Sequence, residues 1–293
     1  MMRRARPLLG TLVEIAAEGG DADRLHSAID AAFAVIEQVH RLTSFHDPES
    51  DVSRLNGAHP SQEVGVNAHT SCVLRFAQEL SELSNGAFDV TMAPALVEAR
   101  FLPAEPTRKP VPAGTSYRDL DLLPDNRVCW RRKGWVDLGG IAKGYAVDCG
   151  IAELRARGTA SGIVNAGGDL HCFGAPQPVH VRHPSAPSAV MLLGWLADAA
   201  LASSAGYFSS IEVDGRRIDP LVDPRQERCT TWNGSITVAA PAGVIADALT
   251  KIVRLAPDRT PDILDRLGAQ AIVIDEQGAR SCGRPLLQTD LGQ

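Results

Sequence analysis

The chain has six cysteines scattered over 293 residues, and none of them forms a C-x-x-C pair. This scatter argues against a disulfide framework and against a structural zinc site. An excess of positive charge is also lacking, because 29 Lys and Arg stand against 35 Asp and Glu. A net charge of −6 does not favour broad binding to nucleic acid, so we expect no nucleic-acid partner.

Long apolar runs are missing as well. No stretch approaches the length of a membrane span, and the basic start, Met-Met-Arg-Arg-Ala-Arg, is not followed by the apolar core of a signal peptide. We therefore expect no membrane span and a cytoplasmic location. The balance of 44% apolar and 22% charged residues is that of a globular protein. We expect a single domain over residues 1–293, with two intimately packed subdomains as the alternative.

Two familiar nucleotide-binding loops are absent. A Walker A loop places its lysine after the last glycine and follows it with Ser or Thr, whereas here Lys143 stands before Gly144 and Tyr145 follows that glycine. The region around Lys143 has no G-x-G-x-x-G pattern either. These absences exclude a P-loop and give no support to a Rossmann fingerprint.

The most informative stretch that is present reads V-D-L-G-G-I-A-K-G-Y-A-V-D, over residues 136–148. Paired glycines before a helix-like pattern predict a turn whose backbone N–H groups meet an anion at a helix N-terminus. Lys143 adds positive charge, and Asp137 adds a carboxylate that accepts from hydroxyl or ring N–H groups or holds a metal. This combination suits a nucleotide with its counter-ion. The alternative is a tight strand-to-helix connection with Lys143 in solvent.

The rest of the chain alternates helical and β-like patterns, which favours an α+β fold with mainly antiparallel sheet. We predict helices over residues 21–40, 67–83, 142–157 and 244–254, and another that starts with Thr260 as N-cap and Pro261 as N1 and ends before Gly268. We predict strands over residues 9–15, 135–138, 162–171 (with a glycine break), 199–203, 211–213, 236–240 and 271–275. Residues 94–124 are rich in proline and are expected to connect these elements with little regular structure.

Several segments together resemble the ApbE family, the flavin transferases that attach FMN from FAD to a target protein. The long motifs are D-L-G-G-I-A-K-G-Y-A-V-D at residues 137–148 and V-N-A-G-G-D at residues 164–169. The shorter ones are L-G-T-L at 9–12, the aromatic and acidic segment at 42–56, G-A-F-D-V-T at 86–91 followed by Pro94, S-S-A-G-Y at 203–207, D-P-R at 223–225 and A-D-A-L-T at 246–250. The resemblance covers residues 9 to about 255, and the motifs follow one another in the family's order.

This resemblance implies a T-fold-like ApbE architecture that binds FAD with Mg²⁺. The residues that would contact FAD are Leu9, Phe45, Ala87, Phe88, Asp89, Asp137, Lys143 and Leu221. The metal would be held by the Gly140 carbonyl, Asp247 and the hydroxyl of Thr250, hard oxygen ligands that suit Mg²⁺. The partner would be a flavoprotein whose Thr or Ser hydroxyl attacks the FMN-side phosphorus, so that AMP leaves.

Some of these residues also have a purely structural interpretation. Asp247 could lie on a solvated helix face, Phe45 and Phe88 could be core aromatics, and Asp89 could cap a turn. Asn165 and Asp169 are expected to shape the glycine break rather than to touch a ligand.

The chain departs from the family pattern at two positions. Pro220 stands where the family has a histidine that is a candidate general base, so Asp219 or Asp223 is expected to assist proton transfer. Lys251 stands four residues after Asp247, where the family commonly has threonine. Two other functions therefore remain open. The first is an FAD diphosphatase that releases FMN and AMP, and the second is a non-catalytic FAD-binding protein.

Overall fold

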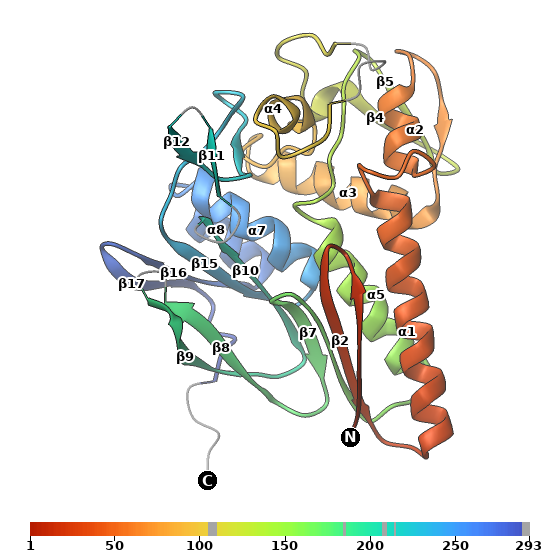
Figure 1. Ribbon diagram of the computed structural model, residues 1–293, viewed down its shortest axis with the longest axis vertical. Coiled ribbons are helices and arrows are strands. Elements are labelled where there is room, and N and C mark those ends of the chain that lie inside the picture. Colours follow the sequence, from red (N-terminus) through yellow and green to blue (C-terminus); the bar gives the residue numbers. More distant parts are fainter. Residues whose placement is uncertain (105–109, 184–185, 207–209, 214, 289–293) are drawn as a thin grey trace. The chain divides into compact units, whose positions relative to one another are not determined.

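The structure is a computed structural model that describes residues 1–104, 110–183, 186–206, 210–213 and 215–288. The chain forms two compact units. Unit 1 comprises Met1–His40, Lys143–Ala205 and Asn233–Gln293, and unit 2 comprises Arg41–Ala142 and Gly206–Trp232. Helices and antiparallel strands occur in both units, which confirms the α+β prediction (Figure 1).

Unit 1 is built on an eight-stranded sheet in the order β1-β2-β6-β7-β10-β15-β16-β17, in which every neighbouring pair is antiparallel. Its strands are β1 Met2–Leu8, β2 Thr11–Glu18, β6 Ser161–Ala166, β7 Asp169–Phe173, β10 Ala199–Ala205, β15 Ser235–Ala240, β16 Gln270–Asp275 and β17 Gly278–Gly283. The strands predicted in the second half of this unit are thereby confirmed. The glycine break predicted within residues 162–171 is the turn Gly167–Gly168 between β6 and β7, where both glycines have positive φ.

The first strand prediction, over residues 9–15, was wrong at its start. Leu9 and Gly10 form the two-residue turn of the β1–β2 hairpin, with φ of 56° and 71°. A residue in the left-handed region cannot continue a strand, so β2 begins at Thr11. The preceding strand β1 was not predicted, because more than half of its residues are arginine or proline and its positions alternate between half-buried and exposed, with none fully buried.

The helices in the described part of unit 1 are α1 Ala22–Thr43 (up to His40), α5 Ala142–Ala156 (from Lys143), α7 Gly243–Leu255 and α8 Thr260–Leu267. Residues of α1 and α5 form one continuous core with β2 and β6, including the fully buried Phe33, Ile151 and Val164. The helix α7 contacts β10 and β15, and α8 contacts β17. The helical periodicity predicted these elements to within a few residues, although the N-cap of α8 is Arg259 and not Thr260.

A second apolar cluster in unit 1 includes a separate hairpin. The strands β8 Gln177–His183 and β9 Ala186–Leu196 pair with each other, and they contribute Val179 and Leu196 to a cluster with Cys172 of β7 and Leu201 of β10. This hairpin was not among the predicted elements.

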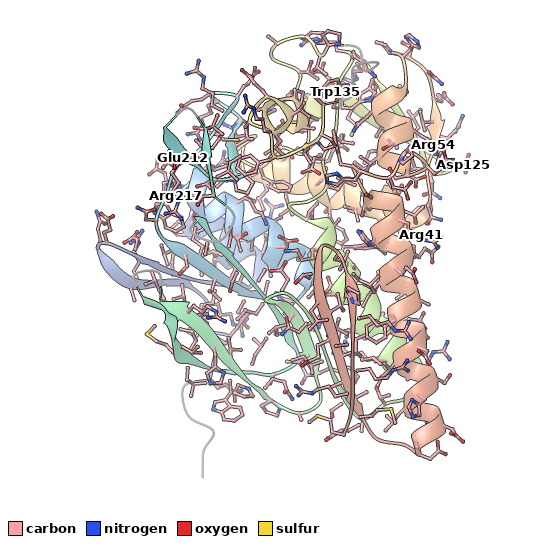
Figure 2. All side chains as sticks on the ribbon, viewed as in Figure 1. Arg41, Arg54, Asp125, Trp135, Glu212 and Arg217 are labelled. Atoms are coloured by element: carbon pink, nitrogen blue, oxygen red, sulfur yellow. The ribbon has the colours of Figure 1, made fainter. Side chains whose placement is uncertain are left out.

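Unit 2 holds a second set of helices and strands. They are α2 Asp51–Gly57, α3 Ala68–Leu83, α4 Ala93–Glu98, the 3₁₀ turn η1 Tyr117–Asp119, the sheet β3-β5-β4 (Val64–Gly65, Arg127–Trp130 and Leu120–Leu123), and the hairpins β11–β12 (Ile211–Val213, Arg216–Ile218) and β13–β14 (Val222–Asp223, Arg228–Cys229). The helix α3 begins after Asn67, whose side chain caps it by accepting from the His69 N–H at 3.0 Å. The labelled Arg54 of α2 donates to the Gly65 carbonyl at 3.0 Å and so ties α2 to β3 (Figure 2).

Two predictions in unit 2 need correction. Residues 135–138 form no strand. The Val136 carbonyl accepts from the Asn56 side chain and the Asp137 N–H donates to the Val90 carbonyl, so these groups do not bond to a neighbouring strand. Residues 94–124 are more ordered than expected, since they contain most of α4, all of η1 and β4. The proline of α4 occupies one of the first two helical positions, where a missing N–H is tolerated.

No helix in the part of the chain that the structure describes is both long enough and apolar enough to span a bilayer.

Candidate functional site

The segment that leads into the D-L-G-G turn is fixed by one buried asparagine. The Asn56 side chain donates to the Val136 carbonyl at 2.9 Å and accepts from the Val136 N–H at 2.7 Å. The next N–H, that of Asp137, donates to the Val90 carbonyl at 2.8 Å. Two motifs about fifty residues apart in sequence, around Asp89 and Asp137, therefore lie side by side in unit 2. The amides of Ile141 and Ala142 then bond to the Leu138 carbonyl and start α5.

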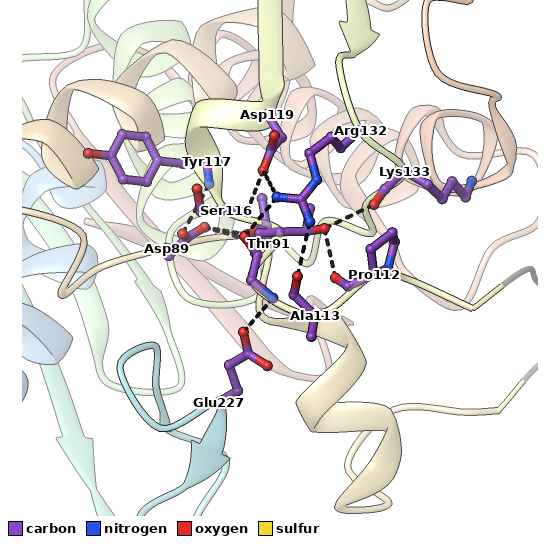
Figure 3. Close-up of polar contacts among 12 residues, drawn as sticks. Asp89, Thr91, Pro112, Ala113, Ser116, Tyr117, Asp119, Arg132, Lys133 and Glu227 are labelled. Carbon is purple, nitrogen blue, oxygen red and sulfur yellow. Dashed lines mark hydrogen bonds and ion pairs between the residues drawn. The ribbon is translucent and has the colours of Figure 1, made fainter.

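Asp89 organises the loop that carries it. Its carboxylate accepts from the Thr91 N–H at 2.8 Å, the Thr91 hydroxyl at 2.7 Å and the Tyr117 N–H at 3.0 Å (Figure 3). Burial raises the pKa of this carboxyl, against the lowering effect of those donors. The Asp89 side chain thus holds the start of η1, and the structural interpretation accounts for both of its oxygens.

The same network extends along residues 112–119. The Thr115 hydroxyl bonds to the Pro112 carbonyl at 2.9 Å, Arg132 donates to the Ala113 carbonyl at 3.0 Å, and the Gly114 N–H donates to Glu227 at 3.0 Å (Figure 3). The aromatic residues predicted to flank FAD, Phe45 and Phe88, are 3% and 5% exposed, and Ala87 between the motif's glycine and Phe88 is also buried. These three residues remain predictions as FAD contacts.

The two aspartates predicted to assist proton transfer each hold a local turn. Asp219 is buried, and its Oδ1 accepts from the Thr230 hydroxyl at 2.7 Å and from the Leu221 N–H at 3.1 Å. Half-buried Asp223 accepts from the Arg225 N–H at 3.0 Å, the usual bond of an aspartate turn. The nearby Arg217, labelled in Figure 2, donates to Ser210 at 2.6 Å. Leu221 is half-buried, and Tyr207 of the S-S-A-G-Y segment lies outside the described residues.

In unit 1, Lys143 lies in the first turn of α5 and meets a buried aspartate. Its Nζ is 2.8 Å from Asp169 Oδ2, while about one third of the Lys143 side chain stays exposed. Burial lowers the pKa of the ammonium, but the charges of Asp169 and Asp247 outweigh it and leave the pKa raised. Asp169 therefore does more than shape the glycine break between β6 and β7, because it is the counter-ion of Lys143.

Asp247 of α7 is buried and has both carboxylate oxygens engaged. Oδ2 accepts from the Gly144 N–H at 3.1 Å, and Oδ1 is ion-paired with Lys251 Nζ one helical turn later. Burial by itself would raise the pKa of Asp247, but Lys251 and Lys143 hold it below its usual value. The interpretation of Asp247 as a residue of a solvated helix face was wrong, since its exposed fraction is only 2%.

The contact between Gly144 and Asp247 also concerns the predicted anion site at the start of α5. The sequence predicted that the N–H groups at the start of α5 meet a bound anion. One of them, that of Gly144, already meets the carboxylate of Asp247.

A second aspartate of the long motif joins the two helices and was missed by sequence reasoning. Asp148 of α5 accepts from the Gly243 N–H at 2.7 Å and the Val244 N–H at 2.9 Å, and so caps α7. It also lies 2.6 Å from His171 Nδ1 on β7. The signal was present as the last residue of the motif, but nothing in the sequence linked it to a helix start 95 positions away.

The two predicted metal ligands of unit 1, Asp247 and Thr250, are already engaged in a way that does not fit Mg²⁺. In unit 1 the Thr250 hydroxyl donates to the Asp247 carbonyl at 2.7 Å, and the carboxylate of Asp247 is shared between Lys251 and Gly144. Mg²⁺ needs carboxylate lone pairs that an ammonium does not already hold. Gly140, the remaining predicted ligand, belongs to unit 2. Across the described ranges, no group of three or more His, Cys, Asp or Glu forms a metal site.

Comparison with known proteins adds to this geometry. Residues 9–273 match the sequence model of the ApbE family. The chain belongs to the ApbE family. The FAD:protein FMN transferase of Escherichia coli K12 is 23% identical over 92% of this chain and 83% of its own length. The enzyme of the same name from Vibrio cholerae is 29% identical over 78% of this chain and 72% of its own length.

Solved ApbE structures share the fold. The ApbE protein of Thermotoga maritima aligns with a TM-score of 0.83 at 25% identity, over 96% of both chains. The apo form of the Pseudomonas stutzeri flavinyl transferase ApbE aligns with a TM-score of 0.81 at 23% identity, over 99% of this chain and 98% of its own. The expected ApbE architecture is thereby confirmed.

Within unit 1 the fold brings together three of the predicted site residues, Lys143, Asp247 and Thr250, and adds Asp169 and Lys251 to them. Leu9 lies instead in the β1–β2 turn, where its N–H points to His40 Nδ1 at 3.5 Å. In unit 2 the fold joins the segments of Asp89 and Asp137. Asp219, Leu221 and Asp223 lie in a different segment, where the two aspartates accept from nearby backbone N–H groups.

Proposed function

We propose that this chain transfers FMN from FAD to a Thr or Ser hydroxyl of a target flavoprotein and releases AMP. The observation that carries the proposal is the ApbE match over residues 9–273. It is supported by the names of the relatives, which match most of this chain. It is also supported by Lys143, whose side chain at the start of α5 is one-third exposed and carries a charge that suits a phosphate group.

The reaction exchanges one P–O bond for another. The acceptor hydroxyl oxygen bonds to the FMN-side phosphorus, the bond to the bridging oxygen breaks, and AMP leaves with that oxygen. The hydroxyl proton passes to a base, for which Asp219 and Asp223 remain the candidates. Negative charge grows on the phosphate oxygens, so a fixed cation such as Lys143 stabilises the transition state more than the bound substrate.

Asp137 and Asp89 are also proposed to contact FAD. The segments that carry Asp137 and Asp89 are joined by the bond from the Asp137 N–H to the Val90 carbonyl. The two bonds between Asn56 and Val136 fix the segment that leads to Asp137, so less entropy would be lost when a ligand binds there. The Mg²⁺ expected from the resemblance is assigned no step, because Lys251 already holds its predicted ligand Asp247. The expected cytoplasmic location stays a prediction.

The test is incubation of the purified protein with FAD and a panel of Thr- and Ser-containing acceptor peptides, followed by mass measurement. An acceptor mass increased by one FMN unit, with AMP appearing in equal amount, supports the proposal. Lys143→Met should lower the rate by at least about tenfold, the loss expected for one charge-assisted phosphate contact. Arg266→Met, on an exposed part of α8, is the matched control and should keep the full rate. Folded, FAD-bound protein that modifies no acceptor would overturn the proposal.

A second candidate is hydrolysis of FAD to FMN and AMP, with water in place of the acceptor hydroxyl. It is favoured by Pro220, which stands where the resemblance places a histidine and cannot accept a proton. Free FMN formed at the same rate with and without acceptor would select hydrolysis. A third candidate, a non-catalytic FAD-binding protein, is favoured by Lys251 beside Asp247. FAD binding with neither product would select it.

A further inference from the structure

Lys251 is fixed to Asp247 at two points. Its Nζ donates to the Asp247 carbonyl at 2.9 Å and is ion-paired with Asp247 Oδ1 on the same helix α7. The Lys251 side chain is 20% exposed and that of Asp247 only 3%. An ammonium held in this way is a built part of the site and not a solvated surface charge.

The surrounding charges balance. Lys143 and Asp169 form a second ion pair, and both interact electrostatically with Asp247. The four side chains Lys143, Asp169, Asp247 and Lys251 therefore carry two positive and two negative charges. A divalent cation added to this set would leave an excess of two positive charges at low solvent exposure, which is unfavourable. A neutral residue at position 251 would instead leave one negative charge for a cation to balance.

We propose that Lys251 is the resident cation of this site, in place of the divalent metal that the ApbE resemblance assigns to Asp247, and that FAD binds here without Mg²⁺. The first half concerns only the residues of unit 1. The second half rests on the proposed use of FAD. A lysine ammonium has three N–H donors, so its contacts with Asp247 are compatible with a further one to a phosphate oxygen.

The first half is tested by Mn²⁺ binding, measured by electron paramagnetic resonance on the full chain without FAD. Wild type and Lys251→Arg should bind no Mn²⁺ at Asp247, because each keeps a cation there. Lys251→Thr should gain one Mn²⁺ site, and the double variant Lys251→Thr/Asp247→Asn should lose it again. A Mn²⁺ site in the wild type that Asp247→Asn removes would overturn the proposal, as would a Lys251→Thr variant that folds and gains no site.

Folding of Lys251→Thr is checked separately, since its Asp247 loses a counter-ion. Its melting temperature should fall below that of the wild type and recover when Mg²⁺ is added, whereas Lys251→Thr/Asp247→Asn should show no response to Mg²⁺. This readout does not depend on FAD or on turnover. A variant that unfolds even with Mg²⁺ present would count against the proposal, because the metal would then not replace the lysine.

The second half is tested by FAD affinity with and without chelator. Wild-type affinity should change less than about twofold when EDTA replaces Mg²⁺, whereas Lys251→Thr should lose at least about tenfold in EDTA, the size of one charge-assisted contact, and regain it with Mg²⁺. A wild type whose FAD affinity collapses in EDTA would overturn this half. If FAD binds neither the wild type nor Lys251→Thr under any condition, the proposed function is overturned. The Mn²⁺ result would still decide the role of Lys251.

Discussion

Gly144 of α5 and Gly243 of α7 meet backbone to backbone. A Cβ built on Gly144 would lie 2.1 Å from the Gly243 carbonyl oxygen, and one built on Gly243 would lie 2.6 Å from the Gly144 carbonyl oxygen. This approach lets Asp148 reach the N-terminus of α7 and lets Asp247 reach the Gly144 N–H. The glycine that follows the lysine in the long motif thus serves helix packing in addition to any ligand.

Gly144→Ala should therefore be strongly destabilising. The clash is with a backbone carbonyl that cannot rotate away, so we expect a loss of at least about 3 kcal/mol in the free energy of unfolding. Gly57→Ala is the matched control, because Gly57 is also helical and nothing lies within 4 Å of its added Cβ. That variant should change stability by less than about 1 kcal/mol. Urea unfolding of both variants makes the comparison, and equal effects would contradict the packing argument.

The Lys143–Asp169 pair should show a large coupling in a double-mutant cycle. Lys143→Met leaves the buried Asp169 charge without its counter-ion, and Asp169→Asn leaves the ammonium unmatched. We expect each single variant to lose about 2 kcal/mol, less than for a fully buried pair because a third of Lys143 is exposed. The double variant should lose less than the sum of the two. Additive losses would show that the pair contributes no interaction energy.

The same lysine predicts an alkaline dependence of stability. Burial opposes the charged form, but Asp169 and Asp247 raise the pKa of Lys143 above 10.5, its value in the unfolded chain. The folded state then binds the proton more tightly, so this contribution is complete below pH 10.5 and is lost as the pH rises through the folded-state pKa. Unfolding free energies measured from pH 9 to about 11.5 should fall more steeply for the wild type than for Lys143→Met. Parallel curves would show that Lys143 is not the group responsible.

Local patterns allowed much of this fold to be predicted. The apolar stripe of α1, the cap at Asn67 and the glycine at the end of α8 each act within a few residues, so the sequence alone locates these helices. The turn at Gly167–Gly168 was predictable for the same reason, because glycine adopts a positive φ without strain. Residues 135–138 have the composition of a strand, but the long-range bonds to Asn56 and Val90 decide their structure.

In the candidate site, too, the features set by local sequence were predicted and those set by long-range contacts were not. Lys143 and Asp247 were found because they lie in motifs, and the ion pair between Asp247 and Lys251 follows from their spacing of one helical turn. The counter-ion role of Asp169 and the cap formed by Asp148 join segments that are far apart in sequence. No local pattern carries that information, so only the folded sheet and helices reveal it.

Asn56 should contribute more to the free energy of unfolding than Asn67, the N-cap of α3. Asn56→Ala would leave the buried N–H and carbonyl of Val136 without their partners, a loss of about 3 kcal/mol. Asn67→Ala removes only the helix cap at the start of α3 and should lose about 1 kcal/mol. If urea unfolding gives the two variants the same stability, the bonds to Val136 are not a main support of the segment before Asp137.

Two of the cysteines, Cys172 and Cys229, should react slowly with alkylating reagents in the native protein. Burial raises the pKa of Cys172 to about 11, and burial with the nearby charges of Asp219 and Glu98 does the same for Cys229. At pH 8 only about one molecule in a thousand would carry either thiolate, the form that attacks an alkylating reagent. Iodoacetamide labelling of the native protein, followed by peptide mass analysis, should leave both residues unmodified.

Unfolding removes the cause of these raised pKa values, so the same reagent should then label both cysteines within minutes at pH 8. In the native protein the labelling rate of Cys229, which is half-buried, should rise about tenfold per pH unit up to its pKa. Cys172, fully buried with its thiol donating to the Leu196 carbonyl at 3.3 Å, should stay slower than Cys229 at every pH because the reagent must also reach it. Rapid labelling of Cys172 at neutral pH would mean that the cluster joining β7 to the β8–β9 hairpin opens far more often than its packing indicates.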